Sequence, residues 1–561
     1  MRRVVKDALA GAGAVVLSLV ALAGLAGAAS AATARTAAAG KVLLVGTYKG
    51  HQGQFKTIQA AADAAKPGDW ILIGPGDYKT SSYRAPKGAA DVPAAILLRT
   101  RDVYVRGMNR NTVIVDGTKP GTPACSSKPS AQNYGPGFGG GRAGLNGIEV
   151  YEANNVWVQN LTTCNFTGGT GDTGNEIWWN GGANGGHIHG KGFVGSYLNA
   201  TSTYYNGPKT ASTYGIFSSD FNGGTFNQDY ASNFDDSGFY IGACQSFCNQ
   251  TLENSQAEYN ALGYSGTNSG GSLLIEHNLF DNNQDGFDTN SQNNGDWPSP
   301  QDGACPAGVS PRIAGAKSCW ILYANTFENN DNPNVPALGA AAAGPVGTGV
   351  SIEGRNDTVM DNRFINNGAW GLVFQPYPDS ETPPKDVVAA GMACHGGTLN
   401  YVVLGLPIPC VYDDWGNALI GNTFTHDGYY GNPTNGDFAE LTLLPGNPIN
   451  CYAGNVDTGG TLTSSPANLQ TTNAACGTAN QAPDANPDFL LQAACDTQAL
   501  GPGIGCLAGT PGYPRVSKVV MHPLPKHLKT MANPCAGVPA NPWCARGKSA
   551  SSKSAWVRRR A

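Results

Sequence analysis

Short apolar runs that begin at regularly spaced glycines dominate the middle of this chain. The glycines lie 23, 23, 25 and 23 residues apart, at Gly192, Gly215, Gly238, Gly263 and Gly286. Asn, Asp, Ser and Gly fill the corners between the runs, and no unit has the 3.6-residue apolar stripe of a helical repeat. A fixed period of this length indicates units that bury their apolar faces only by stacking on their neighbours. The pattern predicts a parallel β-solenoid.

A second signature marks the same region. The run Asn-x-Phe-x-Asn-Asn begins at Asn278, Asn325 and Asn362, and a weaker copy begins at Asn422. Asn tolerates the left-handed backbone of tight corners and can hydrogen-bond its copy in the next coil, while Phe fills the interior. Because the whole set recurs without any unique chemical group, we interpret these residues as structural.

A different pattern precedes the repeats, between Phe55 and Tyr78. Four apolar residues fall on one helical face, namely Ile58, Ala61, Ala62 and Ala65, and Pro67-Gly68 ends the helix. Ile71 and Ile73 then alternate in a strand that Pro75-Gly76 closes. A small amphipathic helix of this kind can cover the open end of a solenoid, whose strand edge and apolar cross-section would otherwise face water.

The run F-x-T-I-Q-A-A…P-G-D-x-I-x-I-x-P-G-x-Y in this segment resembles the N-terminal cap of the pectin-lyase-like superfamily of right-handed parallel β-helix proteins. The later units resemble its generic β-helix repeats, so the resemblance covers residues 41–430. It implies an all-β, right-handed parallel β-helix with a short N-terminal capping helix and long loop insertions. It also implies acidic or neutral polysaccharides as substrates of a lyase, hydrolase or epimerase. The superfamily includes members with no known chemistry, such as phage adhesins and surface proteins, so the fold alone does not decide the function.

The ends of the chain predict secretion. Arg2, Arg3 and Lys6 precede an apolar run over residues 8–29, and small-residue cleavage sites follow, which is typical of a signal peptide over residues 1–34. No later segment is apolar for long enough to cross a bilayer, so we expect no membrane contact after signal cleavage. The expected β-helix domain spans residues 41–435. An irregular, cysteine-bearing region (436–545) and a basic tail (546–561) follow.

The 14 cysteines agree with an extracellular location. Their number is even, none lies in the signal segment, and an oxidising compartment allows all of them to pair. Neighbouring spacings suggest five disulfides: Cys244–Cys248, Cys305–Cys319, Cys394–Cys410, Cys495–Cys506 and Cys535–Cys544. A zinc site would need Cys-x-x-Cys pairs or Cys/His clusters, and the sequence has none.

Composition and charge narrow the class of partner. Charged residues make up only 13% of the chain, the net charge is −5, and no basic stripe runs through the repeats, so nucleic acid is not an expected partner. The 18 Phe, 22 Tyr and 10 Trp argue for a folded chain. Flat rings with few polar neighbours stack on sugar faces by apolar burial. We therefore expect the chain to bind a polysaccharide through Trp178, Trp179, Tyr240 and Trp297. We also expect it to be a monomer.

The densest acidic cluster provides the candidate catalytic residues, Asp235, Asp236, Asp285 and Asp288. Residues one coil apart in a solenoid stand about 4.8 Å apart, so two of these acids on one face would be separated by about 10 Å. That distance is close to the roughly 6.5–9.5 Å that inverting glycoside hydrolysis needs between its two carboxyl groups. The same acids could hold Ca²⁺ through hard oxygen ligands, or could cap backbone amides at corners. The sequence leaves these three interpretations open.

Motifs of specific reactions are weak. A lyase needs a base and a cation beside the uronate carboxylate, and only Lys209 and His277 are basic between Gly192 and Pro311. The polygalacturonase-type hydrolases of the superfamily carry Asn-Thr-Asp, Asp-Asp, Gly-His-Gly and Arg-x-Lys in that order. Here Asp235-Asp236 resembles the second element only loosely, and the histidine run at residues 187–190 precedes it, so no hydrolase roles are carried over. Tyr264, His277 and Asp288 could imitate an epimerase site, without a local motif. We expect the insertions at residues 168–190, 291–318 and 375–415 to wall any groove.

Overall fold

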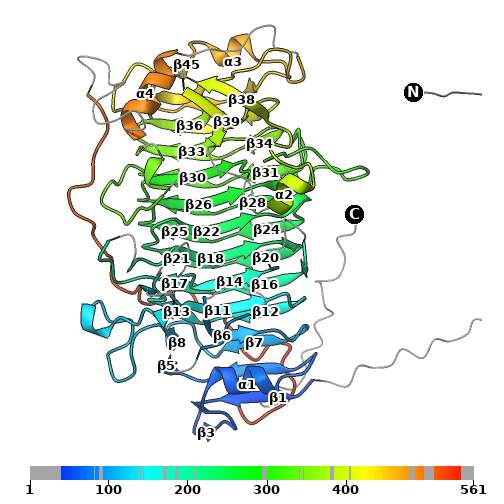
Figure 1. The fold of residues 1–561 in the computed structure, drawn as a ribbon, viewed down its shortest axis with the longest axis vertical. Helices are drawn as coiled ribbons and strands as arrows, with labels where there is room; N and C mark the ends of the chain where they lie inside the picture. Colours follow the sequence, from blue (N-terminus) through cyan, green and yellow to red (C-terminus); the bar gives the residue numbers. More distant parts are fainter. Residues whose placement is uncertain are drawn as a thin grey trace, which may run out of the picture. The chain divides into compact units, whose positions relative to one another are not determined.

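A computed structural model describes residues 40–544 except 81–82, 87–91, 136, 139–140, 143, 169–173, 183–187, 208–209, 294–299, 340, 345, 380–384, 404–405, 479–486 and 498–510. In this part the chain winds into a right-handed parallel β-helix built from three long parallel sheets (Figure 1). Each coil adds one strand to each sheet, in the order sheet 1, sheet 2, sheet 3. The predicted fold is confirmed.

The strands of the three sheets have the following bounds. Sheet 1 contains β1 (Val42–Val45), β4 (Trp70–Ile73), β7 (Tyr104–Gly107), β12 (Val156–Gln159), β16 (Phe193–Ser196), β20 (Gly224–Asn227), β24 (Gln250–Glu253), β28 (Leu274–Glu276), β31 (Trp320–Tyr323), β34 (Asp357–Met360), β40 (Ala418–Ile420) and β43 (Cys451–Ala453). Sheet 2 contains β5 (Gly76–Lys79), β8 (Val113–Asp116), β13 (Thr162–Cys164), β17 (Asn199–Thr201), β21 (Tyr230–Ser232), β25 (Gln256–Glu258), β29 (Leu279–Asp281), β32 (Thr326–Glu328), β35 (Arg363–Ile365), β41 (Thr423–Thr425) and β44 (Val456–Asp457). Sheet 3 contains β6 (Ala94–Leu98), β11 (Asn146–Tyr151), β14 (Ile177–Asn180), β18 (Tyr214–Ser219), β22 (Ser237–Gly242), β26 (Leu262–Thr267), β30 (Asp285–Asn290), β33 (Thr348–Ile352), β36 (Trp370–Phe374), β42 (Gly436–Glu440) and β45 (Ser464–Ser465).

Small elements occupy the corners and insertions. The short strand pairs are β2 (Thr47–Tyr48) with β3 (His51–Gln52), β9 (Gly137–Phe138) with β10 (Gly141–Arg142), β15 (Gly190–Lys191) with β19 (Phe221–Asn222), and β23 (Gln245–Phe247) with β27 (Ser269–Gly271). One antiparallel sheet joins β37 (Tyr377–Asp379), β39 (Leu406–Tyr412) and β38 (Thr398–Val403). The helices are α1 (Ile58–Ala64), α2 (Lys385–Ala389), α3 (Leu469–Thr472) and α4 (Pro487–Thr497).

The predicted capping helix is present at the N-terminal end of the solenoid. Helix α1 begins after Thr57, whose hydroxyl accepts the backbone N–H of Ala60 at 3.2 Å, as an N-cap residue does. Its apolar residues Ile58, Ala61 and Ala62 are buried, and the helix contacts β1, β4 and β6. It therefore covers the apolar cross-section that the first coil would otherwise expose.

Gly215, Gly238, Gly263 and Gly286 lie in strands of sheet 3, where a side chain would meet the crowded interior. Gly192 instead precedes β16 of sheet 1, and a Cβ there would lie 2.7 Å from Asn155 Oδ1. A Cβ atom on Gly263 would lie 2.4 Å from the carbonyl oxygen of Gly286 and 3.0 Å from the buried ring of Phe280. The residue that follows each glycine is also buried, and Tyr264 stacks on Phe287 with ring centroids 4.2 Å apart. Two consecutive residues thus contribute to the interior, so strict in–out alternation is broken at this point of the strand.

Asparagine ladders hold the corners between sheets 1 and 2. The side-chain amide of Asn278 donates to Asn325 at 3.0 Å, Asn325 to Asn362 at 3.0 Å, and Asn362 to Asn422 at 3.1 Å. The same amides also donate to backbone carbonyls of the preceding coil, for example Asn325 to Ile275 at 2.9 Å. These contacts bear out the structural interpretation of the Asn-x-Phe signature, whose Phe residues stack in the core.

The β-helix continues beyond the expected domain end at residue 435. Strands β42 to β45 pair in parallel with the preceding coil, so the ladders reach Ser465 before the irregular region begins. The expected signal peptide (1–34) and basic tail (546–561) lie outside the described residues. In the part of the chain that the structure describes, no helix is both long and apolar enough to cross a membrane.

Six disulfides join cysteines in the described residues, which is typical of proteins from oxidising compartments. Four of the five suggested pairs are confirmed: Cys244–Cys248, Cys305–Cys319, Cys394–Cys410 and Cys535–Cys544. Two further bridges join Cys125 to Cys164 and Cys451 to Cys476. The suggested partner of Cys495, Cys506, lies outside the described residues.

Candidate functional site

One column of side chains on the outer face of sheet 3 changes in character along the solenoid. Its members are aligned by the strand register, each paired with the next one along: Trp178, Phe217, Tyr240, Ser265, Asp288 and Ser351. We call this set the outer column. It is aromatic in the N-terminal coils and polar to acidic in the later ones, so a bound chain that followed it would meet rings first and carboxyl groups afterwards.

The aromatic part of the outer column is tightly packed. Trp178 and Phe217 stack with ring centroids 5.0 Å apart and an interplanar angle of 4°, and Tyr240 meets Phe217 edge-on at 4.6 Å. Trp178 is partly exposed, and its indole N–H donates to Ser219 Oγ at 3.0 Å. Phe217 and Tyr240 are only 8% and 6% exposed. Of these three rings, Trp178 is the one best placed to stack on a sugar, and Tyr240 mainly supports it.

Trp179 requires a correction. Successive side chains of a strand point to opposite faces, so the neighbour of outward-facing Trp178 points inward. Trp179 has no exposed surface, its ring lies 5.0 Å from that of Phe193, and its indole N–H donates to the carbonyl of Val156 at 3.2 Å. It is a core residue that no substrate can reach. Trp297, the fourth predicted ring, lies outside the described residues.

Two of the four predicted aspartates reach the outer face together. The Asp236 carboxylate accepts hydrogen bonds from Tyr214 Oη at 3.2 Å and from Ser265 Oγ at 3.5 Å. Asp288 is paired in register with Ser265, so it stands one strand spacing away, and it accepts the side-chain amide of Asn290 at 3.4 Å. Burial, followed by the negative charge of Asp236, raises the pKa of Asp288 to about 7. The two carboxyl groups therefore act on each other electrostatically.

The other two predicted aspartates are closed off from solvent, which corrects their assignment. Asp285 is fully buried, and its carboxylate accepts the backbone N–H of Phe287 at 3.0 Å, which is the turn-capping role left open by the sequence. Asp235 is also fully buried, and its carbonyl accepts the N–H of Leu338 at 2.8 Å. Both lie under the insertion of residues 331–347, and a substrate outside the solenoid cannot reach either carboxylate.

A third carboxyl group joins Asp236 and Asp288, and sequence reasoning missed it. Glu353 follows the end of β33, and its carboxylate accepts Gln375 Nε2 at 2.6 Å. The same amide donates to Ser351 of the outer column at 2.9 Å. Burial and then the charge of Asp288 raise the pKa of Glu353 well above its usual range. The only sequence signal is an acid directly after an apolar strand, which is too common to single it out.

Two insertions border this acidic group. Asp302, Arg355 and Trp415 follow one another on successive coils through isolated parallel bridges. The Arg355 guanidinium donates to Asp302 Oδ2 at 2.9 Å and lies 5.1 Å from the centre of the Trp415 ring. On the other insertion, Tyr377 Oη accepts a hydrogen bond from Gln292 Nε2 at 3.1 Å. Burial and the charge of Glu353 raise the pKa of Tyr377. The predicted walls at 291–318 and 375–415 therefore meet beside Glu353, whereas the wall at 168–190 lies largely outside the described residues.

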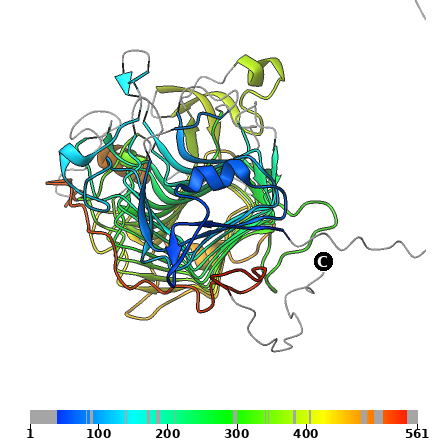
Figure 2. The same cartoon turned by 90° about the horizontal axis from the view of Figure 1, so that it is seen from below.

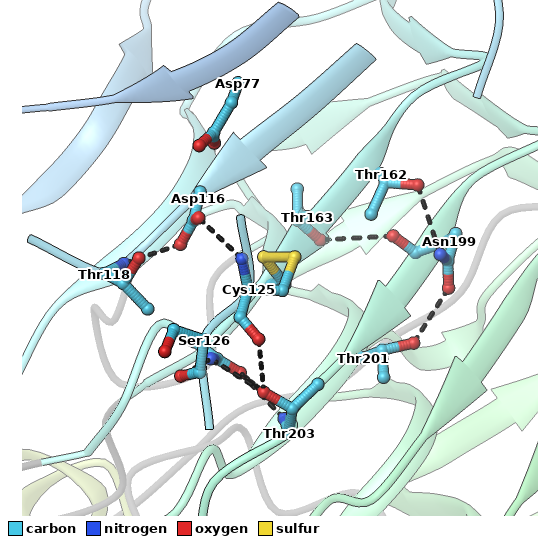
Figure 3. Close-up of a disulfide and its surroundings, with 12 residues drawn as sticks. Asp77, Asp116, Thr118, Cys125, Ser126, Thr162, Thr163, Asn199, Thr201 and Thr203 are labelled. Carbon is cyan, nitrogen blue, oxygen red and sulfur yellow. Dashed lines mark hydrogen bonds between the residues drawn. A yellow bond between two sulfur atoms is a disulfide. The ribbon is translucent and has the colours of Figure 1, made fainter. Parts of the chain in front are cut away.

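The described residues do not provide a calcium site at these acids. Only one group of three Asp, Glu, His or Cys residues brings ligand atoms within 4.8 Å of one another, namely Asp116, Cys125 and Cys164. Figure 3 shows that the two sulfurs form a disulfide, so they are not metal-binding thiolates. Asp116 instead accepts the backbone N–H groups of Thr118 and Cys125, both at 2.7 Å, and thereby fixes the loop after β8. The Ca²⁺ expectation finds no fitting ligand set here, and no chemical step below uses the ion.

The comparison with solved structures finds matches of low sequence identity, with TM-scores below 0.4. The A-module of the mannuronan C-5 epimerase AlgE4 from Azotobacter vinelandii is 12% identical over 71% of this chain and 90% of that one, with a TM-score of 0.38. A tailspike protein of E. coli bacteriophage HK620, in complex with a pentasaccharide, is 12% identical over 72% and 63%, with a TM-score of 0.37. A mutant pectin methylesterase in complex with a hexasaccharide is 12% identical over 75% and 90%, with a TM-score of 0.28.

The shared feature is the parallel β-helix. Neither the protein-family models nor the curated proteins include a match to this sequence. The likeness to the solved structures concerns the fold alone.

Proposed function

We propose that this chain is a secreted enzyme that cleaves an extracellular polysaccharide bound along the outer column of sheet 3. The observation that carries the proposal is that Ser265 of the outer column hydrogen-bonds to Asp236 and is paired in register with Asp288, in line with a row of aromatic rings. Two neighbouring carboxyl groups in different environments are what glycoside hydrolysis requires. Secretion is supported by the six disulfides, and a monomeric state stays a prediction.

The two carboxyl groups have different roles in this proposal. Asp288, whose pKa is about 7, keeps a proton near neutral pH and donates it to the glycosidic oxygen as that bond breaks. Asp236, held by Tyr214 and Ser265, takes a proton from the water that attacks the anomeric carbon. The water oxygen ends on the anomeric carbon, and proton exchange with solvent restores both groups. The carboxyl group of Glu353 lies beside Asp288.

The aromatic part of the outer column supports a substrate of some length. Trp178 and Asp288 are separated by four steps of the register, through Phe217, Tyr240 and Ser265. At about 4.8 Å per strand this is roughly 19 Å. A sugar stacked on Trp178 therefore belongs to the same bound chain as the bond at Asp288 only if that chain follows the solenoid axis.

Non-catalytic polysaccharide binding is the second candidate function. It is favoured by the two buried aspartates and by the hydrogen bonds from Tyr214 and Ser265 that already occupy Asp236. In that case the outer column would bind the same polysaccharide through Trp178 without cleaving it.

A panel of neutral and acidic polysaccharides tests both candidates. Purified protein is incubated with each substrate, and new reducing ends and ultraviolet absorbance from unsaturated uronates are followed together. We expect reducing ends without that absorbance, and loss of the product in Asp288→Asn and Asp236→Asn. Asp281→Asn is the matched control, because Asp281 is a partly buried aspartate with a pKa raised to about 6 on the different outer face of sheet 2. Unsaturated products would exclude hydrolysis, and retention of a polysaccharide without any product would identify a binding protein.

A further inference from the structure

The last described segment of the chain returns along the whole β-helix. Residues 511–544, which we call the strap, leave the last coils near Asn432 and end beside β2 and β3 at the N-terminal end. Figures 1 and 2 show this segment in orange and red, lying against the outside of the coils. Nothing in the repeat pattern requires it, because the solenoid ladders are already complete at Ser465.

Three asparagines bind the strap in the same two-pronged way. In each case the asparagine Nδ2 donates to the carbonyl of one strap residue, and the asparagine Oδ1 accepts the N–H of the same strap residue. Asn432 holds Gly512 at 3.2 and 3.1 Å, Asn233 holds His522 at 3.0 and 3.2 Å, and Asn111 holds Leu528 at 2.8 and 3.0 Å. This geometry copies the pairing of a neighbouring β-strand, with side chains in place of a backbone partner.

Further contacts lie between these three and beyond the last of them. Asn334 Oδ1 accepts the N–H of Ser517 at 3.0 Å, and Asn160 Oδ1 accepts the N–H of Met531 at 3.1 Å. Arg106 donates to the carbonyls of Pro534 at 3.1 Å and Ala536 at 2.7 Å. Between them, His522 stacks on Tyr259 with ring centroids 3.5 Å apart. The strap is therefore bound along its length as well as at its ends.

Aromatic residues anchor both ends of the strap. Tyr513 is buried in an apolar cluster with Trp370 and Phe489. At the other end, Trp543 is 2% exposed and packs with Trp70 and Tyr48. Its indole N–H donates to the carbonyl of His51 at 2.8 Å, and the Cys535–Cys544 disulfide closes the loop that presents it.

The strap is drawn out along the coils and rich in proline. From Asn432 to Asn111 it passes eight steps of sheet 2, from β41 to β8, or about 38 Å at 4.8 Å per strand. The 16 residue steps from Gly512 to Leu528 span at most about 53 Å. Seven prolines punctuate the strap, at positions 511, 514, 523, 525, 534, 539 and 542. Proline lacks the N–H of a sheet ladder and favours extended chain, which explains why side-chain amides replace strand pairing.

We propose that this flank of the β-helix is a surface that recognises an extended, proline-punctuated peptide, and that the strap is its intramolecular ligand and acts as a releasable clamp. The coils of a solenoid contact only their neighbours, so its ends can open independently of its middle. The strap ties residues of the first coils directly to residues of the tenth. With the strap bound, these coils open together, and with the strap released, the N-terminal coils open first.

Hydrogen exchange on the full-length protein tests the clamp. Leu528→Pro removes the N–H that Asn111 accepts, Trp543→Ala removes the anchor, and Lys529→Ala, at an exposed neighbouring side chain, is the control. We expect the amides of His522 and Met531, and those of β4 and β7, to exchange at least 10-fold faster in the first two variants. Those of β34 and β40 should not change. Unchanged exchange at His522 and Met531 in both variants would overturn the proposal.

Two further measurements separate specific recognition by this surface from non-specific packing of the strap on it. Asn111→Ala changes the surface and leaves the sequence of the strap unchanged, and it should accelerate exchange at Leu528 while the control stays at the wild-type rate. A labelled, oxidised synthetic peptide of residues 511–544 should bind full-length Trp543→Ala at least 10-fold more tightly than wild type, because the weakened strap competes less. Equal binding of the peptide to both proteins would contradict the proposal that the strap occupies the peptide-binding surface.

Discussion

The outer faces of sheets 2 and 3 are built on the same parallel ladder but carry different kinds of side chain. In sheet 2 the outward residues of β13, β17 and β21 are buried: Thr162, Asn199 and Tyr230 form one register row, and Cys164, Thr201 and Ser232 form the other. Thr162 and Asn199 hydrogen-bond to each other at 3.1 Å. The strap contacts Asn111 and Asn160 before this sheet and Asn233 after it. In sheet 3 the outer column presents Trp178 and Asp288, both partly exposed. The repeat sets the scaffold, and the segments that cover a face decide which face is free to act.

The largest expected effect separates the two faces by stability. Trp543→Ala leaves a cavity under the end of the strap and should cost about 3–5 kcal/mol of docking free energy, the usual range for a buried Trp. Trp178→Ala, on the free face, should cost much less, because that ring is already partly exposed. Denaturant unfolding of both variants checks this, and equal losses in the two would show that the sheet 3 face is as closed as the strap site.

The next effect separates the faces by activity. If Asp288 is the general acid, Asp288→Asn should lower the cleavage rate by about 100-fold or more, in line with the usual contribution of acid–base catalysis. Leu528→Pro in the strap should leave the rate within about 2-fold at a temperature where both proteins are folded. Initial rates on the active polysaccharide measure both changes. A rate for Leu528→Pro as low as that of Asp288→Asn would mean that the two faces are coupled.

A smaller effect is expected at the aromatic end of the outer column. Trp178→Ala removes a stacking surface, which should weaken polysaccharide binding by about 1–1.5 kcal/mol, or roughly 10-fold, with little change in kcat. Tyr230→Phe on sheet 2 is a suitable control, since Tyr230 is buried against Glu258 away from the outer column. Binding isotherms with the same polysaccharide measure this loss of affinity. Unchanged affinity in the Trp178 variant would place the polysaccharide elsewhere.

The smallest effect concerns pH. The folded-state pKa of Asp288, about 7, lies above the value of 3.8 for an unperturbed Asp, because burial and Asp236 disfavour its charge. Its contribution to stability is therefore fully present below about pH 4 and is lost as the pH rises through 7. Asp288→Asn should then be more stable than wild type at pH 8 and equal to it at pH 4. Melting curves at the two pH values show whether the difference has this sign.

Particular residues show where sequence reasoning held and where it stopped. The spacing of Gly238, Gly263 and Gly286 predicted the coils, because a Cβ at each of these positions would meet the interior of the next coil. Four disulfides followed from spacing alone, since each closes a short local loop. The helix from Ile58 followed from its apolar face and from Pro67-Gly68 after it.

The candidate site was predicted only in part. Asp236 and Asp288 lie on one face as proposed, but Asp235 and Asp285 are buried, with residues of the 331–347 insertion against both of them. The contribution of Glu353 depends on Gln375, 22 residues further along the chain, whose amide holds its carboxylate. No local pattern reveals such a contact, and the strap contacts of Asn111, more than 400 residues away in sequence, are harder still to foresee.

Local chemistry in the sequence determined the coil, its corners and its cap, because glycine, asparagine and apolar side chains each act on their own strand or on the next one. Only the tertiary structure decided which outward positions are reachable. That outcome depends on insertions and on a returning strap whose contacts join residues hundreds of positions apart, and the free energy of those contacts exists only once the coils are stacked.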